Sequence, residues 1–486
     1  MNQHSQYSGT AVAEPAATHA APDRGTPHVP AKLVATLALL AAVAPLAIDM
    51  YLPAFPEMAA EFGTSASAVQ LTLTTFLVGL ALGQLAFGPL SDRFGRRPLL
   101  LVGTLVCAVF SAASALAPTI ELLAAARFLQ GFAGAAGIVL GRAVVSDRAH
   151  GPAAAKLFGL LVVVNAVAPV VAPLVGGTLV TNVGWRSVFW VLTGLSLLMF
   201  ACVVALVPET LPKEHRTTGG IAAMLRDARG ILRNRRYVGY TLAYGFSFGL
   251  MFAYMSASPF VLQNVHGLST GWYTVTFTAN AIGLVIFSVV NGAVAGRFGE
   301  RTTLRIGLTL LAAFSVVMLV DALAGPTLWV TLVTLWFTMG SLGLVIANAT
   351  TLALGEAQRA SGTGSAVLGA LQFLLAAAIS PLVGIGGEDT ALPMGIAMVL
   401  SAAIALGALA LTGSPRGEAQ LLTRMACRLG NKTCPSVPAP RTVGAAHGRM
   451  PPCPTISAGN SGRTATGVAP RFTVTPILSS SPRSRT

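Results

Sequence analysis

The chain has 486 residues, of which 54% are hydrophobic and only 10% are charged. A soluble globular domain carries about 25% charged residues, so this composition excludes a water-soluble protein and indicates one that lies in a lipid bilayer. The net charge of +14 at pH 7 does not indicate a nucleic-acid partner, because no basic face with interleaved aromatic residues occurs. Such a surplus is typical of the loops of a membrane protein.

The N-terminal residues are rich in Ala, Pro, Thr and His and have no apolar periodicity. Residues 1–30 are therefore predicted to form a disordered cytoplasmic arm. The apolar run that starts at Lys32 is too long for a signal-peptide core, and no small-residue cleavage pattern follows it. We therefore expect a membrane helix that is retained.

Apolar runs of spanning length recur along the chain. A transmembrane helix needs about 20 consecutive, mostly apolar residues. Runs of this kind fall near 32–53, 68–90, 98–117, 120–141, 156–179, 187–207, 237–260, 272–295, 303–323, 327–353, 363–384 and 391–412. The sequence thus predicts an all-α polytopic membrane protein with twelve transmembrane helices.

The Lys and Arg residues of the connections predict the orientation. With the N-terminus inside, the inside connections hold 17 basic residues, seven of them between Lys213 and Arg236, whereas the outside connections hold only Arg186. We therefore expect a multi-pass protein of the cell inner membrane with both termini in the cytoplasm.

Three short patterns occur twice in the chain, in the same order and 204 to 208 residues apart. They pair 88–97 with 292–301, 172–176 with 380–384, and Pro53 with Pro259. Two parallel six-helix halves are typical of alternating-access transporters, which hold the substrate between the halves. The predicted halves are 31–207 and 237–412, joined by the cytoplasmic loop 208–236.

The C-terminal segment 413–486 holds ten basic residues and one acidic residue, and is rich in Pro, Gly and Ser without apolar periodicity. We expect a disordered basic cytoplasmic tail. The five cysteines of the chain form no CxxC pair and no Cys/His cluster, so no metal site is predicted.

Neither an ATP site nor a catalytic site is predicted. The phosphate-binding pattern GxxxxGK[ST] is absent, so no cofactor is expected and an ion gradient drives any transport, unless a separate ATPase subunit does. The run Gly245-Phe-Ser-Phe-Gly249 matches a nucleophile elbow, but that motif requires a strand-to-helix turn. Two glycines four residues apart also fit close helix packing in lipid, which we expect here in place of an enzyme.

The loop between the second and third spans carries a specific pattern. Its sequence, Gly88-Pro-Leu-Ser-Asp-Arg-Phe-Gly-Arg-Arg97, resembles the loop G-x-L-x-D-R-x-G-R-[RK] of the major facilitator superfamily. The resemblance implies ion pairs at the cytoplasmic surface that break and re-form as two halves move. The second copy has Gly296 in place of the Asp, so only the first copy is expected to gate. The gating residues are Gly88, Asp92, Arg93, Gly95, Arg96 and Arg97.

Two further patterns narrow the resemblance. Arg127-Phe-Leu-Gln130-Gly131 resembles the R-x-x-Q-G motif of drug exporters of that superfamily. The run 165–177 resembles the antiporter motif of its fifth helix, although Ala172 replaces the usual Gly. The residues of this motif are Pro169, Pro173, Gly176 and Gly177.

Short runs elsewhere resemble the bicyclomycin-resistance (Bcr/CflA) branch of drug/proton antiporters. These runs are 48–53, 70–74, 185–189, 208–210, 254–260 and 364–366. The resemblance covers about 31–412, and it implies export of bicyclomycin- or chloramphenicol-like antimicrobials in exchange for protons.

Two charged residues lie well inside predicted spans, Asp49 and Arg127. A charge at the bilayer centre costs about 2.5–3.5 kcal/mol, so it marks a candidate functional site. No His lies in a span, and Arg127 does not release a proton under working conditions. We therefore expect Asp49 to exchange protons and Arg127 to modulate Asp49 and anchor the fourth span.

Several polar side chains in the spans are candidates for the wall of a substrate cavity. Each of them fits an interhelical hydrogen bond equally well. The candidates are Tyr51, Gln70, Gln130, Asn165, Tyr254 and Asn280.

The sequence favours a monomeric proton-coupled exporter of small-molecule drugs over three alternatives. An exporter of an endogenous metabolite or of a self-made antibiotic would use the same scaffold. A membrane enzyme or receptor would need clustered catalytic groups or metal ligands at the membrane surface, and the sequence has none. A proton symporter that imports nutrients is disfavoured by the Pro and Gly pattern of 165–177 and by the resemblance.

Overall fold

The computed structural model describes residues 30–149, 151–212, 214, 216 and 220–413. Apart from Pro30 and Gly413, the predicted N-terminal arm and basic tail lie outside the described residues. The chain divides into two units, 1–418 and 419–486, and the described residues all belong to the first.

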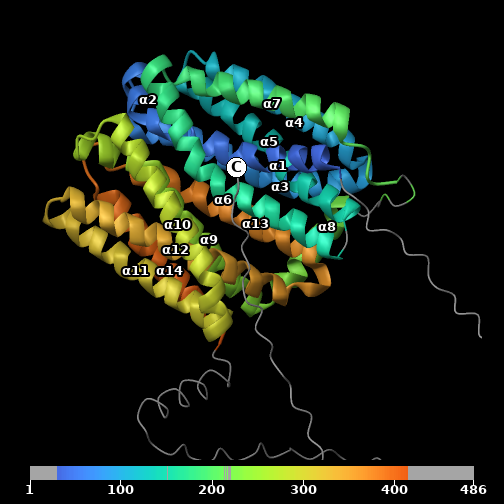
Figure 1. Ribbon diagram of the computed structural model, residues 1–486. Helices are drawn as coiled ribbons and strands as arrows, with labels where there is room; N and C mark the ends of the chain where they lie inside the picture. The colour runs from blue at the N-terminus through green and yellow to red at the C-terminus, as the bar shows by residue number, and fades with distance from the viewer. Residues whose placement is uncertain (1–29, 150, 213, 215, 217–219, 414–486) are drawn as a thin grey trace, which may run out of the picture. The chain divides into compact units, whose positions relative to one another are not determined.

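The described residues fold into α-helices with short 3₁₀ or π segments at some of their ends (Figure 1). The first half contains α1 (Ala31–Asp49), α2 (Phe55–Phe62), α3 (Ala66–Phe94), α4 (Arg96–Ala115), α5 (Ile120–Arg148), α6 (Gly151–Val183) and α7 (Arg186–Leu206). A connecting helix, α8 (Gly220–Ile231), follows. The second half contains α9 (Arg235–Phe260), α10 (Thr270–Phe298), α11 (Glu300–Ala324), α12 (Leu328–Glu356), α13 (Ser361–Ile379) and α14 (Leu392–Ala410).

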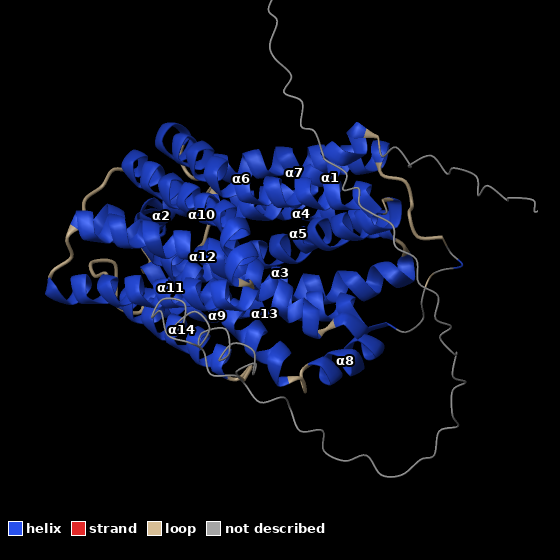
Figure 2. Cartoon of the chain, turned by 60° about the horizontal axis from the view of Figure 1, so that its bottom comes forward, coloured by secondary structure: helices blue, strands red, loops and turns tan. Residues whose placement is uncertain are grey.

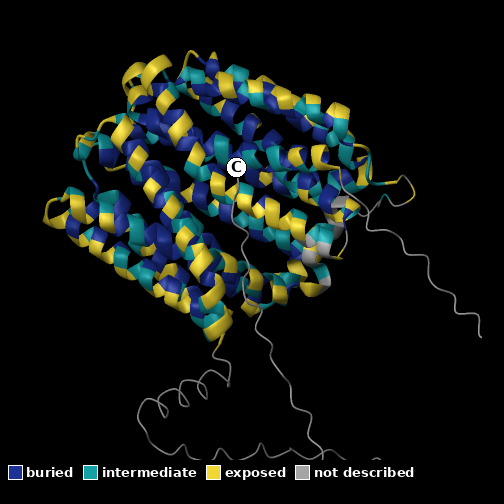
Figure 3. Cartoon of the chain, viewed as in Figure 1, coloured by how far each residue is buried: buried dark blue, intermediate teal, exposed yellow. Residues whose placement is uncertain are grey.

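Twelve helical segments within the described residues are long and apolar enough to span a membrane. Each overlaps one of the twelve predicted runs, so the predicted fold class is confirmed. Large apolar side chains are exposed along these segments, and Figure 3 colours the exposed residues of the helices yellow. Exposed apolar faces of this extent fit contact with lipid tails.

Glycines let the helices of each half approach closely. Gly79 and Gly83 of α3 lie against the backbone of Phe128 and Phe132 of α5, where a Cβ atom would have no room. Contacts of this kind replace the hydrophobic effect as the packing force between helices in lipid. Ser247, the central residue of the elbow-like run, is buried and donates to the carbonyl of Ala243 in its own helix.

The connection 208–236 is not only a loop, because it contains the 12-residue helix α8. This helix contacts α3 and α13, and lies at one end of the helix bundle in Figure 2. The sequence analysis missed it, because a helix this short and this charged cannot span a bilayer. Its sequence is nonetheless rich in good helix formers such as Ala, Leu, Met and Arg.

We call the end of the bundle where α8 lies the basic end, and the other, where α2 lies, the opposite end (Figure 1). Arg96 lies at the basic end, because its backbone N–H donates to Glu209 of the connection that contains α8. The halves are joined at the opposite end. Ser67 Oγ donates to the carbonyl of Pro381 (3.2 Å), and Gln263 Nε2 donates to the carbonyl of Pro53 (3.3 Å).

The helices α6 and α10 also join the halves. Towards the opposite end, Gly177 of α6 lies against the hydroxyl of Thr274 of α10. Towards the basic end, Val162, Val163 and Val289 are 67%, 56% and 74% exposed. Apolar side chains are exposed nearer the opposite end as well, at Val183 of α6 and Trp272 of α10, so both helices present an apolar face along their length.

Candidate functional site

Asp49 is the last residue of α1, and its side chain is buried between the halves. Its Oδ1 atom has no hydrogen-bond partner. The phenol groups of Tyr254 in α9 and Tyr273 in α10 lie within electrostatic reach of the carboxyl. A carboxyl group from the first half thus faces two helices of the second half.

A small polar network surrounds the two tyrosines. Asn280 Nδ2 donates to Tyr254 Oη at 2.8 Å, and the hydroxyls of Ser258 and Tyr273 are 3.5 Å apart. Tyr254 and Asn280 were expected to line a cavity, whereas Ser258 and Tyr273 were missed. Tyr273 was overlooked because it follows the predicted boundary of its span, Trp272, and such tyrosines are common at the membrane interface.

Arg127 is fully buried in α5 and its contacts lie on the first half, although its Nε has no hydrogen-bond partner. Its Nη1 donates to Gln130 Oε1 at 2.7 Å, and its Nη2 donates to the carbonyl of Ala47 at 2.9 Å. The guanidinium lies 4.4 Å from the ring centre of Tyr51 and 4.1 Å from that of Phe76. A desolvated cation–π contact of this kind contributes about 2 kcal/mol.

The contact between Arg127 and Ala47 bears on Asp49. The last carbonyls of a helix lack partners within the helix, and Ala47 lies two residues before the end of α1. No ion pair within 4.0 Å joins Arg127 to Asp49, both of which are described. Arg127 is therefore bonded to the end of α1 through Ala47 and is not directly paired with Asp49.

The motif of α6 lies between α1 and α10, both of which pack against α6. Pro169 and Pro173 are inside the helix, and two glycines follow them. Gly176 lies against the carbonyl of Met50, next to Asp49, and Gly177 lies against Thr274 of the other half. Neither position has room for a Cβ atom, so these glycines allow α6 to approach both neighbours.

The remaining polar candidates are dispersed. Gln70 Nε2 donates to the carbonyl of Ser256 (3.1 Å) and so joins the halves, while Gln130 Nε2 donates to Ser111 Oγ (2.7 Å) behind Arg127. Asn165 is exposed, and its amide donates to the carbonyl of Leu161 in its own helix. Asn165 therefore does not belong to the group around Asp49.

The loop at the basic end forms a cluster of ion pairs. Arg96 Nη1 lies 2.7 Å from Asp92 Oδ1, and Arg96 Nε lies 3.4 Å from Asp147 Oδ2 of α5. Asp147 also accepts a hydrogen bond from Thr210 Oγ1 at 2.7 Å. The cluster thus ties α3 and α5 to the start of the connection. The sequence analysis did not name Asp147, and it gave Thr210 only within the run 208–210 that carries the resemblance.

The other loop residues have simpler surroundings. Arg93 lies over the ring of Phe94, and Arg97 Nη2 donates to the carbonyl of Val204 at 2.8 Å. Gly88 lies within α3 with open space where a side chain would project. No contact named here reaches the second half.

Glu209 completes this cluster from the connection. Gly95 has a φ of +98°, and the following helix α4 begins with two N–H groups that point at the Glu209 carboxylate. Partial burial raises the pKa of Glu209, but the backbone N–H groups of Leu211, Arg96, Arg97 and Thr210 together outweigh it and lower the pKa. The carboxylate therefore caps α4 from a distant part of the chain.

We expect Glu209→Ala to lower the free energy of unfolding by about 1 kcal/mol, as for the loss of other helix caps. Because the pKa of Glu209 is lowered in the folded protein, its contribution is present at neutral pH and is lost as the pH falls through that pKa. Thermal unfolding in detergent measures the effect. The difference in Tm between wild type and Glu209→Ala should shrink under acid conditions, and a difference that grows would contradict the assignment.

Comparison with known proteins identifies the scaffold. Residues 37–381 match the Major Facilitator Superfamily. The chain belongs to the major facilitator superfamily. It is therefore a membrane transporter and not an enzyme. The chain is 41% identical to "Uncharacterized MFS-type transporter YdgK" of Bacillus subtilis over 380 residues. This alignment covers 78% of the chain and 94% of the relative.

A second relative bears on the branch of the superfamily. The "Bicyclomycin resistance protein homolog" of Haemophilus influenzae is 32% identical over 361 residues, covering 74% of this chain and 91% of the relative. The resemblance to the bicyclomycin-resistance branch is thereby confirmed. Among solved structures, a D-xylose-proton symporter aligns with a TM-score of 0.62 at 17% identity, over 79% of this chain and 97% of that one. At that identity the likeness concerns the fold alone.

Proposed function

We propose that this MFS transporter exports small antimicrobial compounds across the inner membrane in exchange for protons. The observation that carries the proposal is Asp49, a buried carboxyl group without a hydrogen-bond partner for its Oδ1, placed between the two halves. The similarity to a bicyclomycin resistance protein homolog supports a drug as the cargo.

The exchange follows from a carboxyl group that binds either a proton or a substrate. An ionised carboxylate buried without a partner carries a large desolvation cost, which a proton or a cationic or polar substrate group relieves. Protonation of Asp49 removes the attraction for the substrate. The two ligands therefore compete for one site, and competition at a site that faces each side in turn couples their fluxes.

The alternation of access requires the contacts between the halves to break. Gln70 and Ser256 are bonded across the interface at the opposite end. In our proposal this arrangement is the state open to the cytoplasm. The outward state breaks the contacts of Gln70 and closes α6 and α10 at the basic end, with the connection 208–236 as the hinge.

The proposed orientation places the basic end and both termini in the cytoplasm. We expect a single cysteine at Thr217, introduced into a variant without the five native cysteines, to react with a membrane-impermeant maleimide only after the cells are permeabilised. A matched cysteine at Thr64, in the link between α2 and α3 at the opposite end, should react in intact cells. Reaction of Thr217 but not of Thr64 in intact cells would reverse the orientation.

The function is tested by accumulation of a panel of fluorescent drugs and antibiotics in cells that express the protein. Expression should lower accumulation of at least one compound, and a protonophore should restore it. An exporter of an endogenous metabolite would instead leave the whole panel unchanged. Lowered accumulation that persists with the protonophore would contradict proton coupling.

A further inference from the structure

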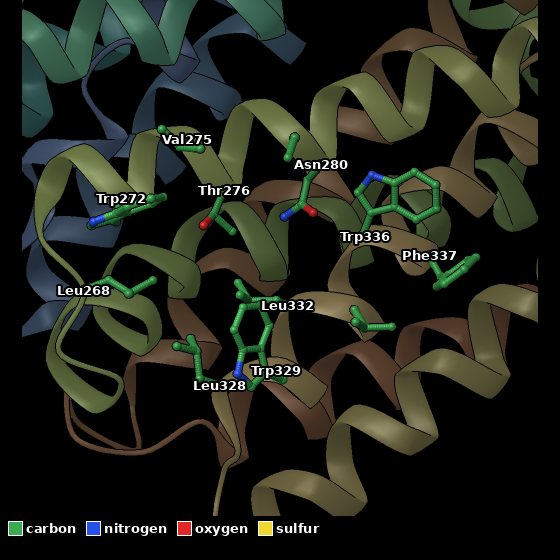
Figure 4. Close-up of a pocket in the computed structure, with 12 residues that line it drawn as sticks. Leu268, Trp272, Val275, Thr276, Asn280, Leu328, Trp329, Leu332, Trp336 and Phe337 are labelled. Atoms are coloured by element: carbon green, nitrogen blue, oxygen red, sulfur yellow. The ribbon is translucent and has the colours of Figure 1, made fainter.

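A groove opens between the N-terminal parts of α10 and α12 (Figure 4). Its volume is about 530 Å³, within the range of sites that hold a small organic ligand. None of its lining side chains is charged. They are Leu268, Trp272, Val275, Thr276, Ala279, Asn280, Leu328, Trp329, Leu332, Val333, Trp336 and Phe337.

The groove lies on the outer surface of the membrane-spanning part of the second half. Trp272 and Trp329 at its rim are 64% and 74% exposed, and both helices are spanning segments. In a bilayer this surface contacts lipid tails, so molecules of the lipid phase fill the groove.

The length of the groove fits one leaflet. Asn280 lies eight positions after Trp272, and Phe337 lies eight positions after Trp329, which corresponds to about 12 Å along each helix. Half of the hydrocarbon core measures about 15 Å. Because both helices line the groove lengthwise, a chain that lies in it runs nearly parallel to the neighbouring lipid tails.

The rim offers hydrogen-bond donors at the depth where lipid tails meet their head groups. Figure 4 shows Trp272 at the Leu268 end, with Trp336 and Phe337 at the far end. Within the described residues, the indole N–H groups of Trp272 and Trp329 have no acceptor. Tryptophans at the membrane interface commonly donate to polar groups of the lipid, and an ester carbonyl is an acceptor of this kind.

We propose that the groove between α10 and α12 binds one acyl chain of a phospholipid from the leaflet at the opposite end. The chain lies along Ala279, Leu332 and Phe337, and its ester group meets the indole N–H groups of Trp272 or Trp329. The absence of charge from the lining favours hydrocarbon over a charged occupant. This inference does not depend on the identity of the transported substrate.

The bound chain has a consequence for the interior. Asn280, which lines the groove, donates to Tyr254 beside Asp49. A hydrocarbon chain over Asn280 excludes water from this hydrogen bond, which strengthens it. The lipid thereby stabilises the wall of the Asp49 site from the membrane side.

Photolabelling tests the proposal. The full chain is reconstituted in phosphatidylethanolamine vesicles that contain a trace of the same lipid with a diazirine at the end of one acyl chain. After illumination, mass spectrometry of peptides maps the labelled residues. Label should concentrate on the far end of the groove, at Trp336, Phe337 and their neighbours, several-fold above the exposed face of α11 at Val316 and Val320.

Two variants that fill the groove, Ala279→Phe and Thr276→Phe, should each remove most of this label. Ala313→Phe, at an exposed position of α11, is the matched control and should leave it unchanged. Equal labelling of the groove and of α11, or unchanged labelling in both filled variants that fold, would overturn the proposal. Displacement of the label by a transported drug would show that the groove holds substrate instead, and would also overturn it.

Discussion

Arg127→Ala is expected to abolish drug export, and Arg127→Lys to restore little of it. The alanine variant loses the bond from the guanidinium to the carbonyl of Ala47, which holds the end of α1 next to Asp49. A hydrogen bond to a charged group contributes about 1.5–3 kcal/mol, so transport should fall by at least about tenfold. The measurement is the initial rate of export at equal membrane abundance.

Lysine fails for a geometric reason. Arg127 bonds Gln130 and Ala47 with separate nitrogens while its plane lies against Tyr51 and Phe76. A lysine offers one compact charge that cannot reproduce this fork and stack. The control is Arg233→Ala, an exposed arginine that follows α8, which should transport normally. Wild-type rates in Arg127→Lys would reduce Arg127 to a generic positive charge.

Asp49→Asn is expected to eliminate uphill export while some substrate binding remains. The amide keeps the shape and hydrogen-bonding capacity of the carboxyl but cannot cycle a proton. In vesicles with an imposed pH gradient, the variant should accumulate no drug above the level of protein-free vesicles. It should still exchange labelled for unlabelled drug when both sides hold substrate, because exchange needs no net proton movement.

The matched control for Asp49 is Asp227→Asn, which neutralises an exposed carboxylate on α8. This variant should accumulate drug as the wild type does. Gradient-driven accumulation by Asp49→Asn at the wild-type rate would place the proton site on another residue.

The membrane fold was predictable because an apolar run of about 20 residues has one stable environment and one stable backbone structure there. The ion pair of Asp92 with Arg96 was predictable in the same local way, since the two residues stand four positions apart on consecutive helices. The helix α8 was not predictable, because hydropathy detects membrane spans and overlooks a short charged helix at the end of the bundle.

The contacts around Asp49 were only partly predictable, because they join residues distant in the chain. Tyr254 and Asn280 stood out as polar groups in apolar runs, but nothing in the sequence places them beside Asp49. An arginine and an aspartate in the same membrane suggest an ion pair. The structure instead gives Arg127 the carbonyl of Ala47, an acceptor that exists only because α1 ends there.

The most direct test of the account is proton release on substrate binding. Purified protein in a weakly buffered detergent solution is mixed with a transported drug, and a pH indicator follows the solution. Wild-type protein should release protons in saturable amounts, and Asp49→Asn, although it binds the drug, should release none. Equal release from both proteins, or drug binding by the wild type without release, would contradict competition between drug and proton at Asp49.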